Sequence, residues 1–159
     1  KNENFVNNIE NKYIDIKNYK DLEFKKYKNK LDNSISFVIK KGKFNSSKSI
    51  HVRVISVKDI ELSDLSSNKL IFKSIKYFYK YDQFVLILIK DQKTLKQKIS
   101  EKLSSNNILR YYGFGAQIIK SLGIKKMILV SRSKKKIIGL EGFGIKIIIH
   151  KKTNTNPNN

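Results

Sequence analysis

Apolar residues in the first third of the chain alternate with polar residues, which is the period of a half-buried β-strand. The alternation predicts strands at residues 22–27, 35–39 and 50–55, and Gly42 ends the second of them. The Asn-Lys-Leu-Asp-Asn sequence of residues 29–33 has the composition of a hairpin turn. We therefore expect an antiparallel meander in this part of the chain.

The apolar spacing then becomes helical. A helix is predicted within residues 63–81, and the fully apolar run at residues 84–89 predicts a buried central strand. The remaining elements follow in order: a short helix at residues 95–103, a helix around Ala116–Leu122 that Gly123 caps, a strand at Met127–Val130, a turn at Lys134–Leu140 and a strand at Ile145–Ile149. Strand–helix–strand units after a meander predict an α/β fold with mixed α+β character and a mixed sheet.

The 159 residues fit one domain, which we expect to cover residues 13–150. Residues 1–12 are polar and predict a linker or disordered segment, and residues 151–159 contain the only proline and predict a disordered tail. Because the sequence begins with lysine, we expect a fragment or a processed chain. No signal peptide and no apolar run of roughly 18–20 residues is present, so we expect a cytoplasmic protein without a membrane partner.

The charge is strongly positive, with 34 lysine and arginine residues against 13 acidic residues and a net charge of +21. Such a chain is attracted to polyanions such as RNA and DNA. However, arginine occurs only at positions 53, 110 and 132, whereas isoleucine, lysine and asparagine are abundant, which is typical of A/T-rich coding sequences. A nucleic-acid surface and a drift in coding composition therefore both remain open.

Few residue types suit catalysis or metal binding. The chain has no cysteine, so it forms no disulfide and no thiolate metal site. Its two histidines, His51 and His150, lie far apart in the sequence, which argues against a zinc site. The possible carboxylate pairs, Asp59 with Glu61 and Asp82 with Asp91, have no histidine partner for acid–base catalysis.

Two segments have the composition of an anion site. Gly113-Phe-Gly115 opens a predicted helix shortly after Arg110, where backbone amides bind anions. On spacing alone, however, a tight turn that needs positive φ is the favoured explanation of the glycines. Ser131-Arg-Ser-Lys-Lys-Lys136 follows a predicted strand and suits a phosphate, although a solvated run of charges is the alternative.

Two longer segments resemble a known family. Residues 110–130 read RYYGFGAQIIKSLGIKKMILV and residues 136–145 read KIIGLEGFGI. They resemble the C-terminal part of GTP cyclohydrolase II, whose pattern is close to RDYGIGAQIL followed by LGV and GL-x-G-[YF]-GL. A looser similarity covers residues 22–54, where Val52-Arg-Val54 resembles the start of the family's RVHSEC segment.

The resemblance implies a nucleotide site. The family opens the imidazole ring of GTP and releases formate and pyrophosphate on the route to riboflavin, using zinc on three cysteines, an aspartate and an arginine. Matching positions make five residues candidates for holding a nucleotide or phosphate: Arg53, Ser56, Arg110, Ser131 and Lys136.

The catalytic positions of the family are altered. Lys58 stands where the resemblance puts the first zinc cysteine, and Ile108 replaces the aspartate two places before Arg110. An ammonium group repels the cation that a thiolate would bind. We therefore expect no zinc, no other cofactor and no catalytic residue, with Arg110 as a vestige.

This pattern resembles the non-catalytic domain that follows 3,4-dihydroxy-2-butanone 4-phosphate synthase in some bifunctional riboflavin proteins. The first hypothesis is a structural or regulatory module for the synthase step, forming a homodimer and fused to or associated with a synthase domain. One alternative is an enzyme or nucleotide binder with altered, metal-free chemistry. The other is a lysine-rich nucleic-acid-binding protein.

Overall fold

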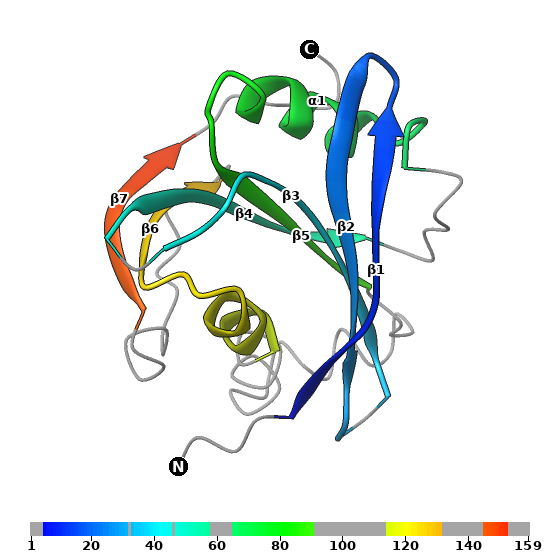
Figure 1. Cartoon of the computed structure of the whole chain (residues 1–159), viewed down its shortest axis with the longest axis vertical. Coiled ribbons are helices and arrows are strands. Elements are labelled where there is room, and N and C mark those ends of the chain that lie inside the picture. Colours follow the sequence, from blue (N-terminus) through cyan, green and yellow to red (C-terminus); the bar gives the residue numbers. More distant parts are fainter. Residues whose placement is uncertain are drawn as a thin grey trace, which may run out of the picture.

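The computed structural model describes residues 5–31, 33–45, 47–57, 65–90, 114–131 and 145–152. These residues form a mixed, seven-stranded sheet with a helix on each face (Figure 1). The elements are β1 (Val6–Ile16), β2 (Tyr19–Asn29), β3 (Ile35–Lys41), β4 (Ser49–Val57), α1 (Lys69–Phe78), β5 (Phe84–Lys90), the helix of residues 114–121, β6 (Lys126–Ser131) and β7 (Lys146–Lys152). Within the described ranges, neither helix is long and apolar enough to cross a membrane.

The sheet has an antiparallel half and a parallel half. Its strand order is β1-β2-β3-β5-β4-β6-β7, in which neighbours from β1 to β5 are antiparallel and neighbours from β5 to β7 are parallel. The α/β class with a mixed sheet is therefore confirmed.

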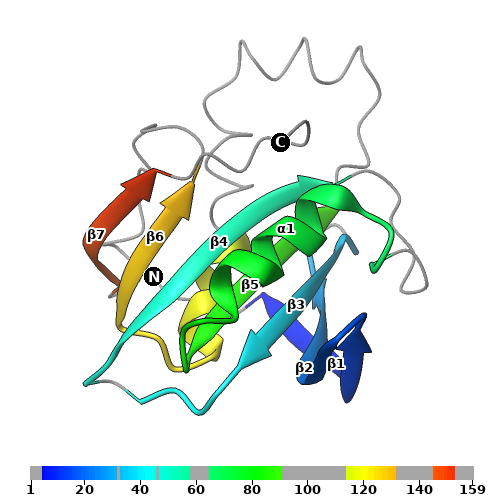
Figure 2. The ribbon, with the colours of Figure 1, turned by 90° about the horizontal axis from the view of Figure 1, so that it is seen from above.

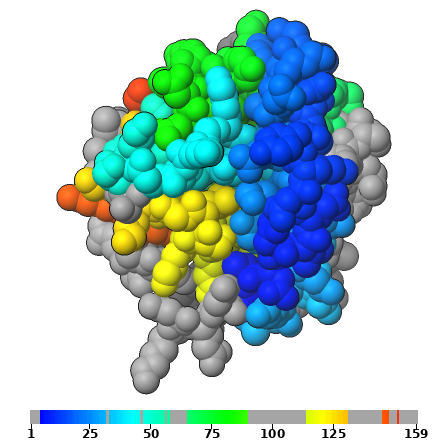
Figure 3. Space-filling view, in the orientation of Figure 1, coloured from blue at the N-terminus to red at the C-terminus, as the bar shows by residue number. Residues whose placement is uncertain are grey.

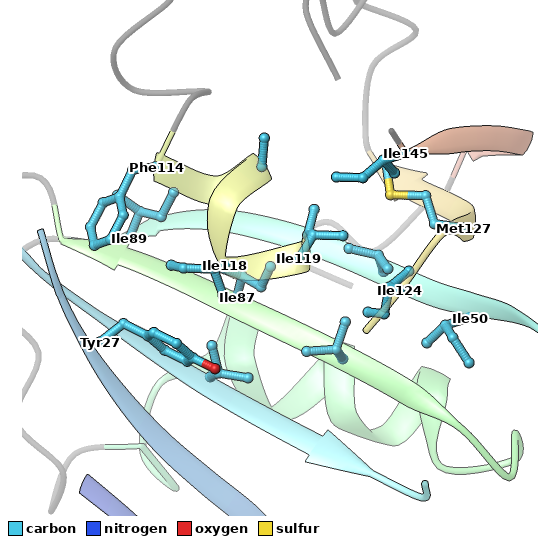
Figure 4. Close-up of a cluster of buried hydrophobic side chains, with 14 of the residues drawn as sticks. Tyr27, Ile50, Ile87, Ile89, Phe114, Ile118, Ile119, Ile124, Met127 and Ile145 are labelled. Carbon is cyan, nitrogen blue, oxygen red and sulfur yellow. The ribbon is translucent and has the colours of Figure 1, made fainter. Parts of the chain in front are cut away.

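β5 occupies the centre of the sheet, as its apolar run predicts. Val85, Ile87 and Ile89 belong to the core cluster that includes the helix of residues 114–121. Phe84 and the leucines of β5 face the opposite cluster, which includes α1. Figure 2 shows α1 lying over β4 and β5 with the second helix on the other side of the sheet, and Figure 4 shows the side chains beneath that second helix. Each face of β5 is thus closed by one helix.

The two helices have clear local signals. The side chain of Asn68 accepts a hydrogen bond of 3.0 Å from the Ile71 amide, so Asn68 caps α1 and the helix begins later than the predicted residue 63. The predicted cap at Gly123 is confirmed, because Gly123 has φ +80° and its amide bonds to the Lys120 carbonyl at 3.0 Å. Gly115 lies inside the second helix without a positive φ, so a tight turn at that glycine is wrong.

Two predictions about the N-terminal part are wrong. Residues 6–12, expected in a linker, are the first half of β1, which pairs with β2 from Val6↔Asn29 to Ile16↔Tyr19. β1 is an edge strand whose side chains are mostly exposed, so it lacks the apolar alternation that reveals a strand. The strand at residues 50–55 exists as part of β4, but β5 lies between it and β3, so it does not continue the meander.

At the other end of the chain, residues 151–152 belong to β7 and not to a tail. The predicted elements at residues 95–103 and 134–140 lie outside the described residues. Figure 3 shows the atoms of residues 114–131, in yellow, beside those of the first strands, in blue, and below the cyan segment that follows these strands. Segments distant in sequence therefore close this face of the sheet together.

The turn between β3 and β4 supplies a test of the fold. A Cβ on Gly42, which has φ +89°, would lie 2.6 Å from the Asp82 carbonyl oxygen and 2.8 Å from Gln83 Cγ. We expect Gly42→Ala to lower the free energy of unfolding by about 2–3 kcal/mol, because backbone strain and overpacking act together. Gly123→Ala is the matched control: it has φ +80° and open space, so we expect a loss of about 1 kcal/mol. Equal losses for the two variants in urea unfolding would contradict this packing.

Candidate functional site

The parallel half of the sheet brings two predicted site residues to one edge. β4, β5, β6 and β7 run in the same direction, so their carboxyl ends lie together. Ser56 is the next-to-last residue of β4 and Ser131 is the last residue of β6, and these two strands are neighbours. Ligands of open α/β sheets commonly bind at this edge.

The helix of residues 114–121 begins beside the same edge. A Cβ on Gly115 would lie 3.6 Å from Cδ1 of Ile89, the next-to-last residue of β5. Phe114 and Ile89 are neighbours in the core shown in Figure 4. The first amide groups of a helix have no partner within it and carry a partial positive charge. A helix start and the ends of parallel strands therefore meet, as an anion site requires.

Arg53 lies on the opposite face of the sheet. It is only 4% exposed, and its Nη1 donates a hydrogen bond of 3.0 Å to Ser74 Oγ on α1. The Ser74 hydroxyl in turn donates to the Leu70 carbonyl at 2.8 Å. The guanidinium thus connects β4 to α1. The structure does not bring it to the face where the helix of residues 114–121 lies.

Two of the five candidates, Arg110 and Lys136, lie outside the described residues, as do Lys58 and Ile108. Ser56 and Ser131 are placed by their strands alone. The structure therefore brings two candidates to one edge and separates Arg53 from them.

Sequence reasoning missed Gln117, which follows Ala116 in the segment that resembles the family. Gln117 Oε1 accepts a hydrogen bond of 2.8 Å from the Phe5 amide, and the Phe5 carbonyl accepts one of 2.7 Å from the Lys30 amide. The chain that leads into β1 is therefore attached to the helix that begins at the candidate anion site. Its place within the Gly-Ala-Gln-Ile segment was the signal that could have identified Gln117.

His51 is a core residue of β4, and no group of possible metal ligands includes it in the part of the chain that the structure describes. Its ring stacks on the Tyr81 ring with centroids 3.6 Å apart, and Nε2 has no hydrogen-bond partner among the described residues. Burial, followed by the charges of Lys151 and Lys80, lowers the pKa of His51 to about 4. The imidazole is therefore neutral near pH 7.

Zinc does not fit the residues present. The chain supplies no thiolate, and the described ranges contain no group of three His, Cys, Asp or Glu side chains that could hold a metal ion. We therefore derive no reaction step through a metal.

The lowered pKa of His51 predicts a loss of stability in mild acid. The unfolded chain takes up a proton near the ordinary pKa of 6.5, whereas the folded protein does so only at about 4. Between these values the unfolded state binds more protons, so the free energy of unfolding falls with pH by on the order of 2–3 kcal/mol. Urea unfolding of the wild type and of His51→Gln, which does not titrate, measures this difference. Equal losses for both proteins would contradict the prediction.

Comparison with known proteins gives the family. The profile of GTP cyclohydrolase II matches residues 8–152. Riboflavin biosynthesis protein RibBA of Chlorobium phaeovibrioides is 42% identical over 59 residues, which are 37% of this chain and 14% of the relative. A 3,4-dihydroxy-2-butanone 4-phosphate synthase of Sulfurospirillum multivorans is 53% identical over 49 residues, which are 30% of this chain and 13% of the relative. The aligned segments thus span only a small part of these curated relatives.

A solved structure shares the fold. The crystal structure of RibBX, a two-domain 3,4-dihydroxy-2-butanone 4-phosphate synthase from A. baumannii, superposes with a TM-score of 0.60 at 21% identity. The superposition covers 96% of this chain and 41% of that chain. A profile match over nearly the whole sequence shows that this chain belongs to the GTP cyclohydrolase II family.

Proposed function

We propose that this chain is a non-catalytic member of its family and serves riboflavin biosynthesis as a structural or regulatory module. One observation carries the proposal: a family whose site is built on three cysteines is represented here by a chain with none. The resemblance puts Lys58 at the first of these cysteine positions.

The chemistry explains why this loss matters. Opening the imidazole ring of GTP requires a water molecule that is a strong nucleophile near neutral pH, and a bound metal provides one by lowering the pKa of water. An ammonium group cannot accept the proton of that water or coordinate a cation. Ile108, at the position of the family's aspartate, cannot accept a proton either. Neither route to an activated water remains.

The retained geometry supports binding without turnover. The helix of residues 114–121 begins beside the end of β5, at the edge of the sheet where the parallel strands β4 and β6 also end. Backbone amides bind phosphate oxygens without any catalytic side chain. We therefore assign Ser56, Ser131, Arg110 and Lys136 to a phosphate or nucleotide ligand, and Arg53 to attaching α1.

The relatives suggest the partner. One of them is named a 3,4-dihydroxy-2-butanone 4-phosphate synthase, and the similar solved structure is a two-domain synthase of which this fold is one part. In this chain, the residue that leads into β1, Phe5, bonds to Gln117 on the helix of the candidate site. A synthase domain associated with this end, in a cytoplasmic homodimer, is the arrangement that we propose.

The loss of cyclohydrolase activity is tested directly. We expect the purified chain, incubated with GTP and zinc, to release formate no faster than the buffer does. A family member with the three cysteines, assayed under the same conditions, is the positive control, and titration of this chain with GTP measures binding separately. Formate release from GTP above the buffer rate would contradict the proposal, whatever the titration shows.

The module role predicts assembly. We expect the chain to have twice its monomer mass in light scattering at micromolar concentration, and to copurify with a coexpressed 3,4-dihydroxy-2-butanone 4-phosphate synthase and change its rate. A Gln117→Leu variant, which cannot accept the bond from Phe5, should weaken that effect. A strict monomer that neither binds the synthase nor changes its rate would contradict this role.

A further inference from the structure

β1 forms one edge of the seven-stranded sheet. Among the described strands it pairs with β2 alone, and this pairing is regular from Glu10↔Lys26 to Ile14↔Leu22. Figure 2 shows β1 at the end of the row of strands, beyond β2 and at the opposite end from β7. In an edge strand, the N–H and C=O groups of alternate residues face away from the neighbouring strand. The outer side of β1 therefore presents hydrogen-bond donors and acceptors to another strand.

This edge carries exposed apolar side chains. Ile9 and Tyr13 of β1 are 49% and 70% exposed, and they lie four residues apart in the middle of the strand. Edge strands that remain unpaired are usually protected by charged side chains at such positions. The outer edge of β1 thus combines backbone groups with apolar surface that a second strand can cover.

The charges of β1 differ from those of the chain. The strand contains two acidic residues, Glu10 and Asp15, against one lysine, Lys12, so its net charge is −1, whereas the whole chain carries +21. Lys12 Nζ lies 3.0 Å from Glu10 Oε2, and both side chains are 40% exposed. Two copies of so basic a chain repel each other over most of their surface. At β1, in contrast, each copy offers an acid and a base side by side.

These residues are arranged symmetrically around Asn11. Ile9 and Glu10 precede it, and Lys12 and Tyr13 follow it in the mirrored order. We propose that two copies of this chain associate by antiparallel pairing of their β1 strands, with a two-fold axis at Asn11. In this register Ile9 stands opposite Tyr13 of the second copy, and Glu10 stands opposite Lys12 of the second copy. The two-fold axis gives each of these pairs twice.

Neighbouring registers lose this complementarity. An axis at Glu10 or at Lys12 would place two like charges directly opposite each other, which destabilises an antiparallel pair. Either shift would also separate Ile9 from Tyr13. The hydrophobic and charged pattern therefore specifies one register, as it does within a sheet.

The inference rests on the homodimer of the proposed function and names its interface. Pairing through β1 joins the two sheets at the end opposite β7. The carboxyl ends of β4 and β6, where the candidate anion site lies, belong to the other half of the sheet. Dimerisation by this edge is thus compatible with a ligand at that site.

A charge reversal tests the interface. In light scattering of the whole chain at about 0.15 M salt, which limits the general repulsion, we expect a wild-type dimer. Glu10→Lys puts like charges opposite twice per dimer, so we expect dimerisation to weaken about tenfold or more. The double variant Glu10→Lys with Lys12→Glu restores both pairs with reversed signs and should return to within about threefold of the wild type. Asp82→Lys, an equal charge change at an exposed residue before β5, is the control, with less than about a twofold effect.

Disulfide formation tests the register. The chain has no cysteine, so each single variant has one thiol per copy. Asn11→Cys places two thiols at the axis, with Cα atoms about 4.5–5.5 Å apart, which a disulfide can bridge. Asn7→Cys is the matched control, because it is exposed on the same strand but lies about 26 Å from its equivalent in this register. We expect oxidation to link the Asn11→Cys protein into a covalent dimer and to leave the Asn7→Cys protein unlinked.

The outcomes separate this interface from the proposed function. A wild-type dimer that Glu10→Lys does not weaken, or equal linking of the two cysteine variants, would overturn pairing through β1 and leave the homodimer intact. A strictly monomeric wild type would overturn the homodimer and this interface together. Formate release from GTP would contradict the non-catalytic role, while rescue by the double variant would still support the β1 interface.

Discussion

The burial of β5 on both of its faces is the constraint on which the rest of the structure depends. A strand of alternating isoleucine, valine, leucine and phenylalanine side chains must be covered on each side, and each fully buried side chain contributes roughly 1.5–3 kcal/mol when it leaves water. α1 covers one face and the helix of residues 114–121 covers the other (Figure 2). The start of the second helix is thereby held at the carboxyl edge of the parallel strands. Both helices are held by apolar side chains, so this packing is compatible with the loss of zinc ligands that we propose.

The same constraint explains what happens to Arg53. Its neighbours along the same face of β4, Ile55 and Val57, are buried beneath α1, so a guanidinium at this position must find hydrogen-bond acceptors inside the protein. Ser74 supplies one from the second turn of a helix that is otherwise apolar on its inner side. A residue that the resemblance assigns to nucleotide binding is in this way part of the sheet–helix interface. The resemblance matches Arg53 by residue type alone, whereas the packing of α1 on the sheet determines what the guanidinium contacts.

The elements that follow from local chemistry were predictable from the sequence, and those that depend on distant pairing were not. A few neighbouring residues are enough to predict three of these elements: β5 from its apolar run, α1 from its apolar spacing and the helix end from Gly123. β1 was missed because a polar edge strand gains its stability from pairing with β2, which leaves no periodic signal. The place of Ser131 at the end of a strand was predictable, because a short apolar run marks that strand. The face of Arg53 and the stacking of His51 on Tyr81 were not, because both depend on which helix covers which side of the sheet.

The excess of lysine over acidic residues affects the structure beyond the net charge. Where no carboxylate is near, ammonium groups lie over aromatic rings: Lys17 is 4.2 Å from the Phe72 ring centre, and Lys41 is 4.1 Å from that of Tyr79. Such contacts accommodate lysines that coding drift would introduce, so a lysine over a ring does not by itself indicate selection for a ligand. Lys80 and Lys151 make the same kind of contact, with Nζ 5.2 Å and 5.5 Å from the centre of the Tyr81 ring.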